Sequence, residues 1–290
     1  MLAVLLGLVA ALCFGAMTVA VRAGLQRVPD SEAGAFVTAA VGFVVAVLID
    51  LAGSTGPDDL TSSELLPFLL AGLIAPGVAG VLFVLAVELA GAARAAVLIT
   101  AAPLLAAVPA FLLLGEPFHW ALAGGAVLIV VGGIVLGGER LEQVGFRKIG
   151  LVVALAAAAL IAVRDNFARW AARHHHVAGL AAGTAALAGA TALLFLYLLA
   201  TRGRRAFGTI RRAFGPFFLA GVLLGVAYAA LLEALTRGRV TVVTPLYATE
   251  SLWTVLLAMV FIARTERIGR RLLLATALMV GGATLIGAFR

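Results

Sequence analysis

Ten long apolar runs divide this chain, and they restrict its fold more than any other feature of the sequence. A helix needs about 20 apolar residues to cross a hydrocarbon layer of about 30 Å, and most of the runs are long enough to do so. Their hydrophobicity is continuous rather than alternating, which excludes a transmembrane β-barrel. The runs are Leu2–Val21, Ala33–Ile49, Leu65–Val87, Ala95–Gly115, Trp120–Gly138, Ile149–Trp170, Val177–Ala200, Gly215–Leu232, Val240–Ala263 and Leu272–Phe289.

The composition also places the chain in a lipid bilayer. Only 12% of the 290 residues are charged and 63% are hydrophobic, whereas a soluble domain carries about 25% charged residues. The net charge of +7 comes almost entirely from arginines that cluster between the apolar runs, since Lys148 is the only lysine. This pattern is typical of anchoring to an anionic membrane face and does not indicate a nucleic-acid partner.

Several features recur at a nearly constant distance in the two halves of the chain. The recurring pairs are Arg22 and Arg169, Glu116 and Glu266, and Gly133 and Gly282, separated by 147, 150 and 149 residues. An odd number of spans in each copy turns the second copy upside down, as in the inverted repeats of secondary transporters. We therefore expect an all-α integral membrane protein with ten transmembrane helices, arranged as two inverted five-helix repeats over residues 1–143 and 144–290.

The positive charges between the runs are unequally divided. If successive loops alternate between two sides, 15 arginines and lysines fall on one side and 5 on the other. The positive-inside rule places the richer side in the cytoplasm. We therefore expect a multi-pass protein of the cell (inner) membrane with both termini outside the cytoplasm. The richer side carries Arg22, Arg27, Arg94, Arg140, Arg147, Lys148, Arg202, Arg204, Arg205, Arg211, Arg212, Arg264, Arg267, Arg270 and Arg271.

The run Ile149–Trp170 places charge where a membrane helix is expected to have none. Its first fifteen residues are uncharged and too few to span, so Arg164 and Asp165 fall inside the span or just under its edge. An ionisable group at that depth costs about 2.5–3.5 kcal/mol on insertion scales, which makes it a functional candidate together with the adjacent Asn166. The alternative is an interfacial ion pair between Asp165 and Arg169, four residues apart on one helix face.

A second buried charge, Glu250, lies about ten residues from either end of the run Val240–Ala263. A carboxylate near the bilayer midplane suits proton coupling or the binding of a cationic group. Pro245 removes one backbone hydrogen bond about one turn away, which frees a carbonyl to face a cavity. The alternative is a purely structural ion pair between Glu250 and Arg164.

Other residues are candidates for lining the same cavity. They are Tyr247 and Trp253 beside Glu250, Thr18 in the first run, Thr100 in the fourth and Tyr228 in the eighth, with apolar walls from Phe14 and Met17. No nucleophile elbow, phosphate-binding glycine loop or metal-ligand spacing occurs in the sequence. We therefore expect no catalytic residue, cofactor or metal, and do not expect an enzyme.

These features together resemble a known family, the EamA branch of the drug/metabolite transporter superfamily. The resemblance lies in Phe14-Gly15 with Arg22, in the segment Ala95–Phe118 and in the segment Arg239–Ile268, and it covers the whole chain. It implies a ten-helix inner-membrane carrier with a central cavity that moves small metabolites, commonly by export. The chain departs from the usual pattern in Phe14, where tryptophan is common, in Trp253, where the second copy often has proline, and in Arg164-Asp165-Asn166 within the sixth helix.

The leading hypothesis is a secondary transporter that exports an amino acid or a related zwitterion by alternating access. Arg164 would meet a carboxylate, Glu250 would bind a proton or an ammonium group, and Asp165 and Asn166 would orient the arginine. Arg164 is expected to have Glu250 as its partner. The alternatives are an exporter of cationic or lipophilic drugs and a non-transport membrane protein, either lipid-handling or structural. Because both copies share one chain, a monomer is expected.

The predicted topology can be tested with reporter fusions at Arg290. We expect a reporter that is active only outside the cytoplasm to give a signal at this position. If successive loops alternate between the two sides of the membrane, Arg290 falls on the arginine-poor side. A fusion in the loop around Arg205 serves as the matched opposite-side control. A clear cytoplasmic signal at Arg290 would overturn the prediction.

Overall fold

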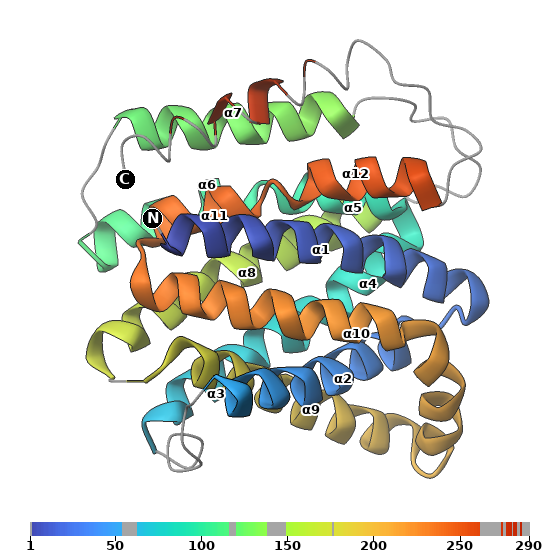
Figure 1. Cartoon of the computed structure of the whole chain (residues 1–290). Coiled ribbons are helices and arrows are strands. Elements are labelled where there is room, and N and C mark those ends of the chain that lie inside the picture. The colour runs from blue at the N-terminus through green and yellow to red at the C-terminus, as the bar shows by residue number, and fades with distance from the viewer. Residues whose placement is uncertain are drawn as a thin grey trace.

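A computed structural model describes residues 2–53, 63–115, 120–137, 149–175 and 177–261, together with 274, 277–279, 281–282 and 285. These residues form helices joined by short connections, and no strand occurs among them. In Figure 1 the long helices lie side by side, with their axes running across the view. The helices are α1 (Leu2–Arg27), α2 (Ser31–Ala52), α3 (Leu66–Gly72), α4 (Ala79–Ala90), α5 (Ala92–Ile99), α6 (Ala102–Leu113), α7 (Trp120–Gly137), α8 (Ile149–His174), α9 (Gly179–Arg202), α10 (Arg205–Arg237), α11 (Val240–Tyr247) and α12 (Glu250–Phe261), with the short segments η2 (Ser63–Leu65) and η3 (Leu73–Val78).

Seven helical stretches in the described residues are long and apolar enough to cross a membrane. The expectation of ten continuous spanning helices is therefore met only in part. The fourth predicted run is divided between α5 and α6, and the fifth is the apolar helix α7. The tenth run, and the predicted boundary between residues 143 and 144, lie largely or wholly outside the described residues. The seven stretches are Leu2–Arg27, Ser31–Ala52, Ser63–Ala90, Ile149–His174, Gly179–Arg202, Arg205–Arg237 and Val240–Ala258.

Three of the apolar runs are interrupted within their length. Within η3, Ala75 leaves helical geometry (φ −148°, ψ 126°) directly before Pro76, because a residue that precedes proline is disfavoured in the helical region. The fourth run breaks at Thr100, and the ninth breaks between α11 and α12. Interrupted backbone at membrane depth is tolerated where protein or a cavity surrounds it. The breaks therefore indicate where a buried site can form.

The first helices of the two halves run in opposite directions. At one end of the bundle, the start of α1 packs against the end of α10, where a Cβ added to Gly238 would lie 3.0 Å from the Cβ of Ala3. The end of α8 reaches the same place, because Arg169 donates hydrogen bonds to the Leu235 and Thr236 carbonyls at 3.0 and 3.1 Å. Thus α1 begins where α8 ends.

The second helices of the two halves are reversed in the same way. Arg202, at the end of α9, contacts Asp30 and Glu32 at the start of α2. We call this the arginine-rich end of the bundle. In the described residues it carries Arg22, Arg27, Arg202, Arg204, Arg205, Arg211 and Arg212.

Glycines allow several of these helices to approach closely. A Cβ on Gly72 of α3 would lie 1.9 Å from the carbonyl oxygen of Ala186 in α9, and a Cβ on Gly225 of α10 would lie 2.6 Å from the carbonyl oxygen of Gly42 in α2. Lipid tails are as apolar as leucine side chains, so helix association in a bilayer depends on such close van der Waals contact. These crossings join the first half of the chain to the second.

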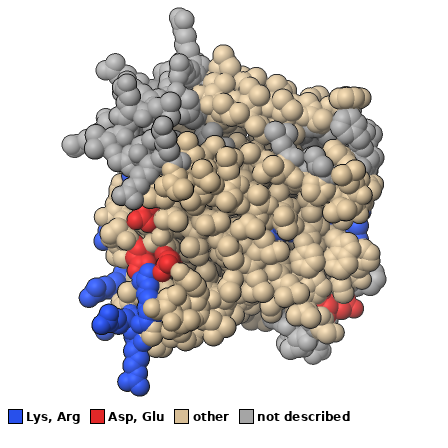
Figure 2. Space-filling view, turned by 180° about the vertical axis from the view of Figure 1, so that it is seen from behind, with Lys and Arg blue, Asp and Glu red and all other residues tan. Residues whose placement is uncertain are grey.

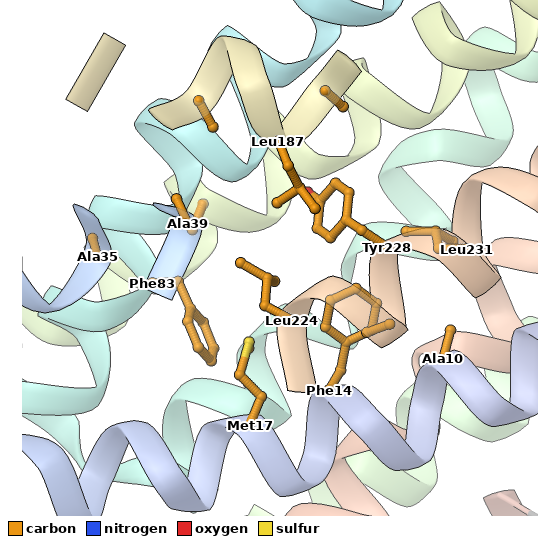
Figure 3. Close-up of a cluster of buried hydrophobic side chains, with 14 of the residues drawn as sticks. Ala10, Phe14, Met17, Ala35, Ala39, Phe83, Leu187, Leu224, Tyr228 and Leu231 are labelled. Carbon is orange, nitrogen blue, oxygen red and sulfur yellow. The ribbon is translucent and has the colours of Figure 1, made fainter. Parts of the chain in front are cut away.

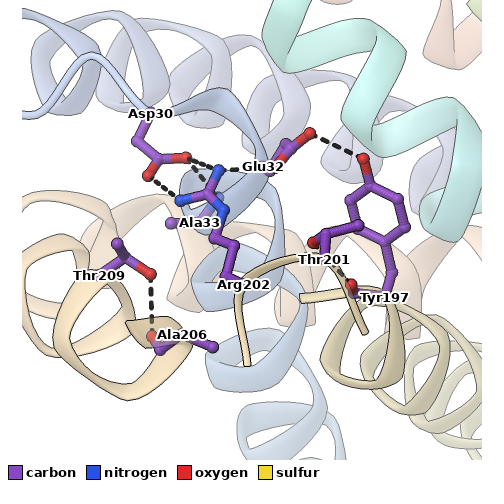
Figure 4. A network of polar contacts seen from close by, with 8 residues as sticks. All are labelled: Asp30, Glu32, Ala33, Tyr197, Thr201, Arg202, Ala206 and Thr209. Atoms are coloured by element: carbon purple, nitrogen blue, oxygen red, sulfur yellow. Dashed lines mark hydrogen bonds and ion pairs between the residues drawn. The ribbon is translucent and has the colours of Figure 1, made fainter. Parts of the chain in front are cut away.

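A polar cluster fastens α2 to α9 at the arginine-rich end (Figure 4). Arg202 donates from Nη1 to Asp30 Oδ2 at 2.5 Å and from Nη2 to Glu32 Oε2 at 2.6 Å. Asp30 also caps α2 by accepting from the Ala33 amide at 3.0 Å. Partial burial raises the pKa of Asp30, but the hydrogen bonds from Arg202 and Ala33 and the guanidinium charge outweigh it and hold this pKa below its ordinary value.

This cluster predicts a pH-dependent loss of stability in Arg202→Gln. We expect the substitution to lower the free energy of unfolding by about 1 kcal/mol at neutral pH, because two partly exposed carboxylates lose their shared cation. The folded-state pKa of Asp30 is depressed, so its stabilisation is complete above its unfolded pKa of about 3.9 and is lost as pH falls through the folded value. The difference in the free energy of unfolding between wild type and Arg202→Gln should therefore shrink as the pH falls through the folded-state pKa of Asp30.

Thermal unfolding in neutral detergent at several pH values measures this gap. Arg204→Gln is the matched control, because Arg204 is exposed and has no carboxylate partner among the described residues. Equal destabilisation by the two substitutions, or a gap that does not change with pH, would contradict the prediction.

Candidate functional site

A cavity lies between the two halves of the bundle. Its wall combines side chains from α1, α2, η3, α4 and α5 of the first half with side chains from α8, α10, α11 and α12 of the second. The lining residues of α1 and α2 come from the parts of these helices nearest the arginine-rich end, among them Val21 and Ala35. The cavity therefore extends from the centre of the bundle toward that end.

Most of the cavity wall is apolar and aromatic. Figure 3 shows Phe14 and Met17 of α1 directed toward Leu224 and Tyr228 of α10, with Phe83 of α4 beside them. The rings of Phe14 and Tyr228 meet edge to face, with centroids 5.9 Å apart. Aromatic pairs in this geometry contribute about 0.5–1.5 kcal/mol beyond the area that they bury. The packing of these rings gives this part of the wall a defined shape.

The polar part of the wall is built around Arg164 and Asp165 of α8. The Arg164 Nε atom lies 3.0 Å from Asp165 Oδ1, and the two side chains are 3% and 0% exposed. Asp165 also accepts at Oδ2 from the hydroxyl groups of Tyr247, through a short bond, and of Thr244, at 3.3 Å. Asp165 thus joins α8 to α11, and both of its oxygens are directed to partners in the protein.

Arg164 is ion-paired differently from the sequence-based expectation. The close partner of Arg164 is Asp165, not Glu250. The Asp165 side chain is directed toward the guanidinium of its neighbour in α8, because Tyr247 and Thr244 donate hydrogen bonds to its other carboxylate oxygen. Glu250 lines the same cavity and is 5% exposed. The alternative ion pair between Asp165 and Arg169 is also absent from the described contacts, since Arg169 donates to the carbonyls at the end of α10.

The guanidinium of Arg164 keeps hydrogen-bonding capacity for a ligand. Its Nε and Nη1 atoms are buried and have no hydrogen-bond partner among the described residues, although the Nε atom lies close to Asp165. Its carbon Cζ lies 5.1 Å from the centre of the Tyr228 ring, a cation–π contact. Buried donors without acceptors cost free energy. A carboxylate in the cavity would supply the missing acceptors.

Nine residues were candidates from the sequence, and the structure separates them into two groups. Arg164, Glu250, Tyr247 and Tyr228 line the cavity, and Asp165 lies directly behind them. The other four lie outside the lining. They are Asn166, which donates to the Ala162 and Ala106 carbonyls; Thr18, which donates to the Phe14 carbonyl; Thr100, which packs against Gly133; and Trp253, which packs against Gly15.

Sequence reasoning missed part of the lining contributed by the first half of the chain. Ala75 and Pro76 of η3 face the cavity, as do Thr38 of α2 and Phe83 of α4. Pro76 gave the one available signal, because a proline in the middle of an apolar run predicts an interrupted helix. Nothing in the local sequence distinguishes Thr38 or Phe83 from residues that only pack helices.

The fold and this cavity define a multi-pass α-helical membrane protein with a buried charged site between two sequence repeats. The chain belongs to the EamA-like transporter family, part of the drug/metabolite transporter superfamily, because the family model matches residues 1–138 and again residues 148–288. Membership places it with transporters rather than enzymes. The two matches also establish the two-repeat organisation that the recurring glutamates and glycines predict.

Solved structures show the same fold. Twenty-nine chains of solved structures match. One of them, a crystal structure, has a TM-score of 0.73 and a sequence identity of 24% to this chain. The match covers 99% of this chain and 96% of the other. A search of curated protein sequences finds no match.

The contribution of the Asp165 hydrogen bonds to stability can be tested by a substitution at Tyr247. We expect Tyr247→Phe to lower the free energy of unfolding by about 1–3 kcal/mol, because the fully buried Asp165 carboxylate loses a hydrogen-bond donor. The matched control is Tyr197→Phe, which removes the same kind of bond, from the Tyr197 hydroxyl to Glu32 Oε1, at an exposed site. Thermal unfolding of both variants measures the difference. An equal effect of the two substitutions would contradict the buried role of Asp165.

Proposed function

We propose that this protein is a secondary transporter that moves an amino acid or a related zwitterion across the inner membrane, in the direction of export. The observation that carries the proposal is the pairing, in one buried cavity, of a guanidinium with free donors and a carboxylate. Arg164 and Glu250 both line the cavity and are 2% and 5% exposed. An acid and a base in a buried site suit a ligand that carries both charges better than a neutral one.

Each charged group has a role in this proposal. Arg164 binds the substrate carboxylate through Nη1, which has no hydrogen-bond partner among the described residues, and Asp165 holds the guanidinium in place at Nε. Glu250 binds the substrate ammonium group or, in the empty carrier, a proton. Exchange of a proton for an ammonium group at one carboxylate couples transport to the proton gradient, since both cannot occupy Glu250 at once.

Alternating access fits the position of the cavity. The cavity extends toward the arginine-rich end, whereas toward the opposite end Ala10, Leu231 and Leu235 are fully buried in close packing. We propose that ten helices, as two inverted five-helix repeats, rock about the centre and close one side as the other opens. With the arginine-rich end in the cytoplasm, the state described here receives substrate from the cytoplasm. A monomer contains both repeats and suffices.

The apolar wall supports a second candidate, an exporter of lipophilic cations. Phe14, Tyr228 and Phe83 offer ring faces and edges, and Glu250 alone would neutralise a cationic drug. The two candidates differ at Arg164. A cationic ligand gains nothing from the guanidinium and is repelled by it, whereas a zwitterion requires it.

A ligand screen by thermal stabilisation separates the candidates. Purified protein is heated with amino acids, nucleosides, sugars and cationic drugs; a ligand at 100 times its dissociation constant stabilises the folded state by about 2.7 kcal/mol. We expect amino acids to stabilise wild type and not Arg164→Gln. Stabilisation by cationic drugs in both proteins would favour the second candidate, and no stabilisation by any compound would contradict a transport site here.

The roles of the two carboxylates can be tested by transport in reconstituted vesicles. We expect Glu250→Gln to abolish proton-coupled transport and Asp165→Asn to weaken substrate binding, because the first removes the group that exchanges a proton for substrate and the second loosens Arg164. Trp253→Phe, outside the cavity lining, is the control. If folded Glu250→Gln and Asp165→Asn proteins transport at the wild-type rate, the site assignment is wrong.

A further inference from the structure

The first turns of α10 differ from the rest of this long helix. Residues 205–214 precede Gly215 and Pro216, and a proline inside a helix removes a backbone hydrogen bond and bends the axis. In Figure 1 these turns stand at an angle to the remainder of α10, at the arginine-rich end of the bundle. This part of α10 therefore runs across the end of the bundle rather than through the membrane.

Three kinds of side chain occupy three sides of this segment. Ala206 and Ala213, seven residues apart on one face, are fully buried against the protein. Phe207 and Phe214, on an adjacent face, are 59% and 52% exposed. The remaining face carries the exposed residues Arg204, Arg205, Gly208, Arg211 and Arg212. An exposed aromatic face beside an exposed cationic face is the pattern of a helix that lies in a membrane interface.

The four exposed arginines have no carboxylate within reach among the described residues. The neighbouring acids Asp30 and Glu32 are occupied by Arg202, which holds both at 2.5–2.6 Å. No Asp or Glu occurs between residues 203 and 232. Figure 2 shows basic side chains projecting together from this corner of the molecule. The local charge is thus uncompensated within the described part of the protein.

We propose that residues 204–214 form a docking surface for the headgroups of anionic phospholipids. The phenylalanines enter the boundary between headgroups and acyl chains, and Arg204, Arg205, Arg211 and Arg212 bind the lipid phosphates above them. Charge complementarity and continuity with a membrane-spanning helix select a lipid leaflet as the occupant. The proposal does not depend on what the cavity transports.

The test is a lipid titration of the purified full-length protein, followed by native mass spectrometry. We expect wild type to bind phosphatidylglycerol at least about tenfold more tightly than phosphatidylcholine, since each arginine near an anionic surface adds roughly fivefold. Replacing the four arginines with glutamine should remove this preference. Replacing the same four with lysine is the matched control and should keep it. Equal affinity for the two lipids in wild type, or a preference that survives in the glutamine variant, would overturn the proposal.

Additional variants and competition measurements distinguish a lipid-binding surface from a site for free phosphate. If the fourfold glutamine variant fails to fold, the double variants Arg204→Gln/Arg205→Gln and Arg211→Gln/Arg212→Gln are used, and each should lose part of the preference. At about 1 M salt, where the screening length falls to about 3 Å, the preference should weaken. Inorganic phosphate should displace phosphatidylglycerol no better than sodium chloride of equal ionic strength. Stronger displacement by phosphate would identify a free-phosphate site and overturn the lipid proposal.

Discussion

The arrangement of the cavity depends on how the chain stabilises one arginine inside the membrane. A charge on an isolated helix at that depth is costly, so Arg164 requires a local counter-charge and a polar shell. Asp165 supplies the counter-charge at 3.0 Å, and the hydroxyl of Tyr247 holds the other carboxylate oxygen. This interaction connects α8 with α11 and fixes where the two halves of the second repeat meet. The cavity forms on the side of the guanidinium that Asp165 leaves open.

The two repeats contribute unequally to the site. The first repeat supplies part of the apolar wall and the irregular backbone around Pro76, whereas Arg164, Asp165 and Glu250 all come from the second. The two halves thus match the same family model without carrying the same charged residues. Close crossings such as Gly72 on Ala186 join them, and such contacts tolerate little added volume because the helix backbones lie against each other.

Much of this organisation could be predicted from residue patterns. The long apolar runs, the recurrence of Glu116 at Glu266 and the uncompensated charge of Arg164 predicted a repeated membrane protein with a buried polar site. The partner of Arg164 could not be predicted, because a side chain next to it in sequence points in another direction on an ideal helix and its rotamer depends on Tyr247, 82 residues away. Thr18 and Trp253 have residue types common in binding sites, yet they pack between helices, which only the helix rotations determine.

An arginine at the arginine-rich end can either join two helices or remain available to lipid phosphates, and the carboxylates around it determine which. Arg202 is held by two carboxylates and joins α2 to α9, while Arg204, two residues later, is exposed and has no such partner in the part of the chain that the structure describes. The positive-inside rule counts both equally, because it describes how loops are retained during insertion. Once the protein is folded, only unpaired cations can attract lipid phosphates, since a cation bound to two carboxylates presents little net charge. The local ion pairs, rather than the loop charge, therefore determine which part of the arginine-rich end faces an anionic leaflet.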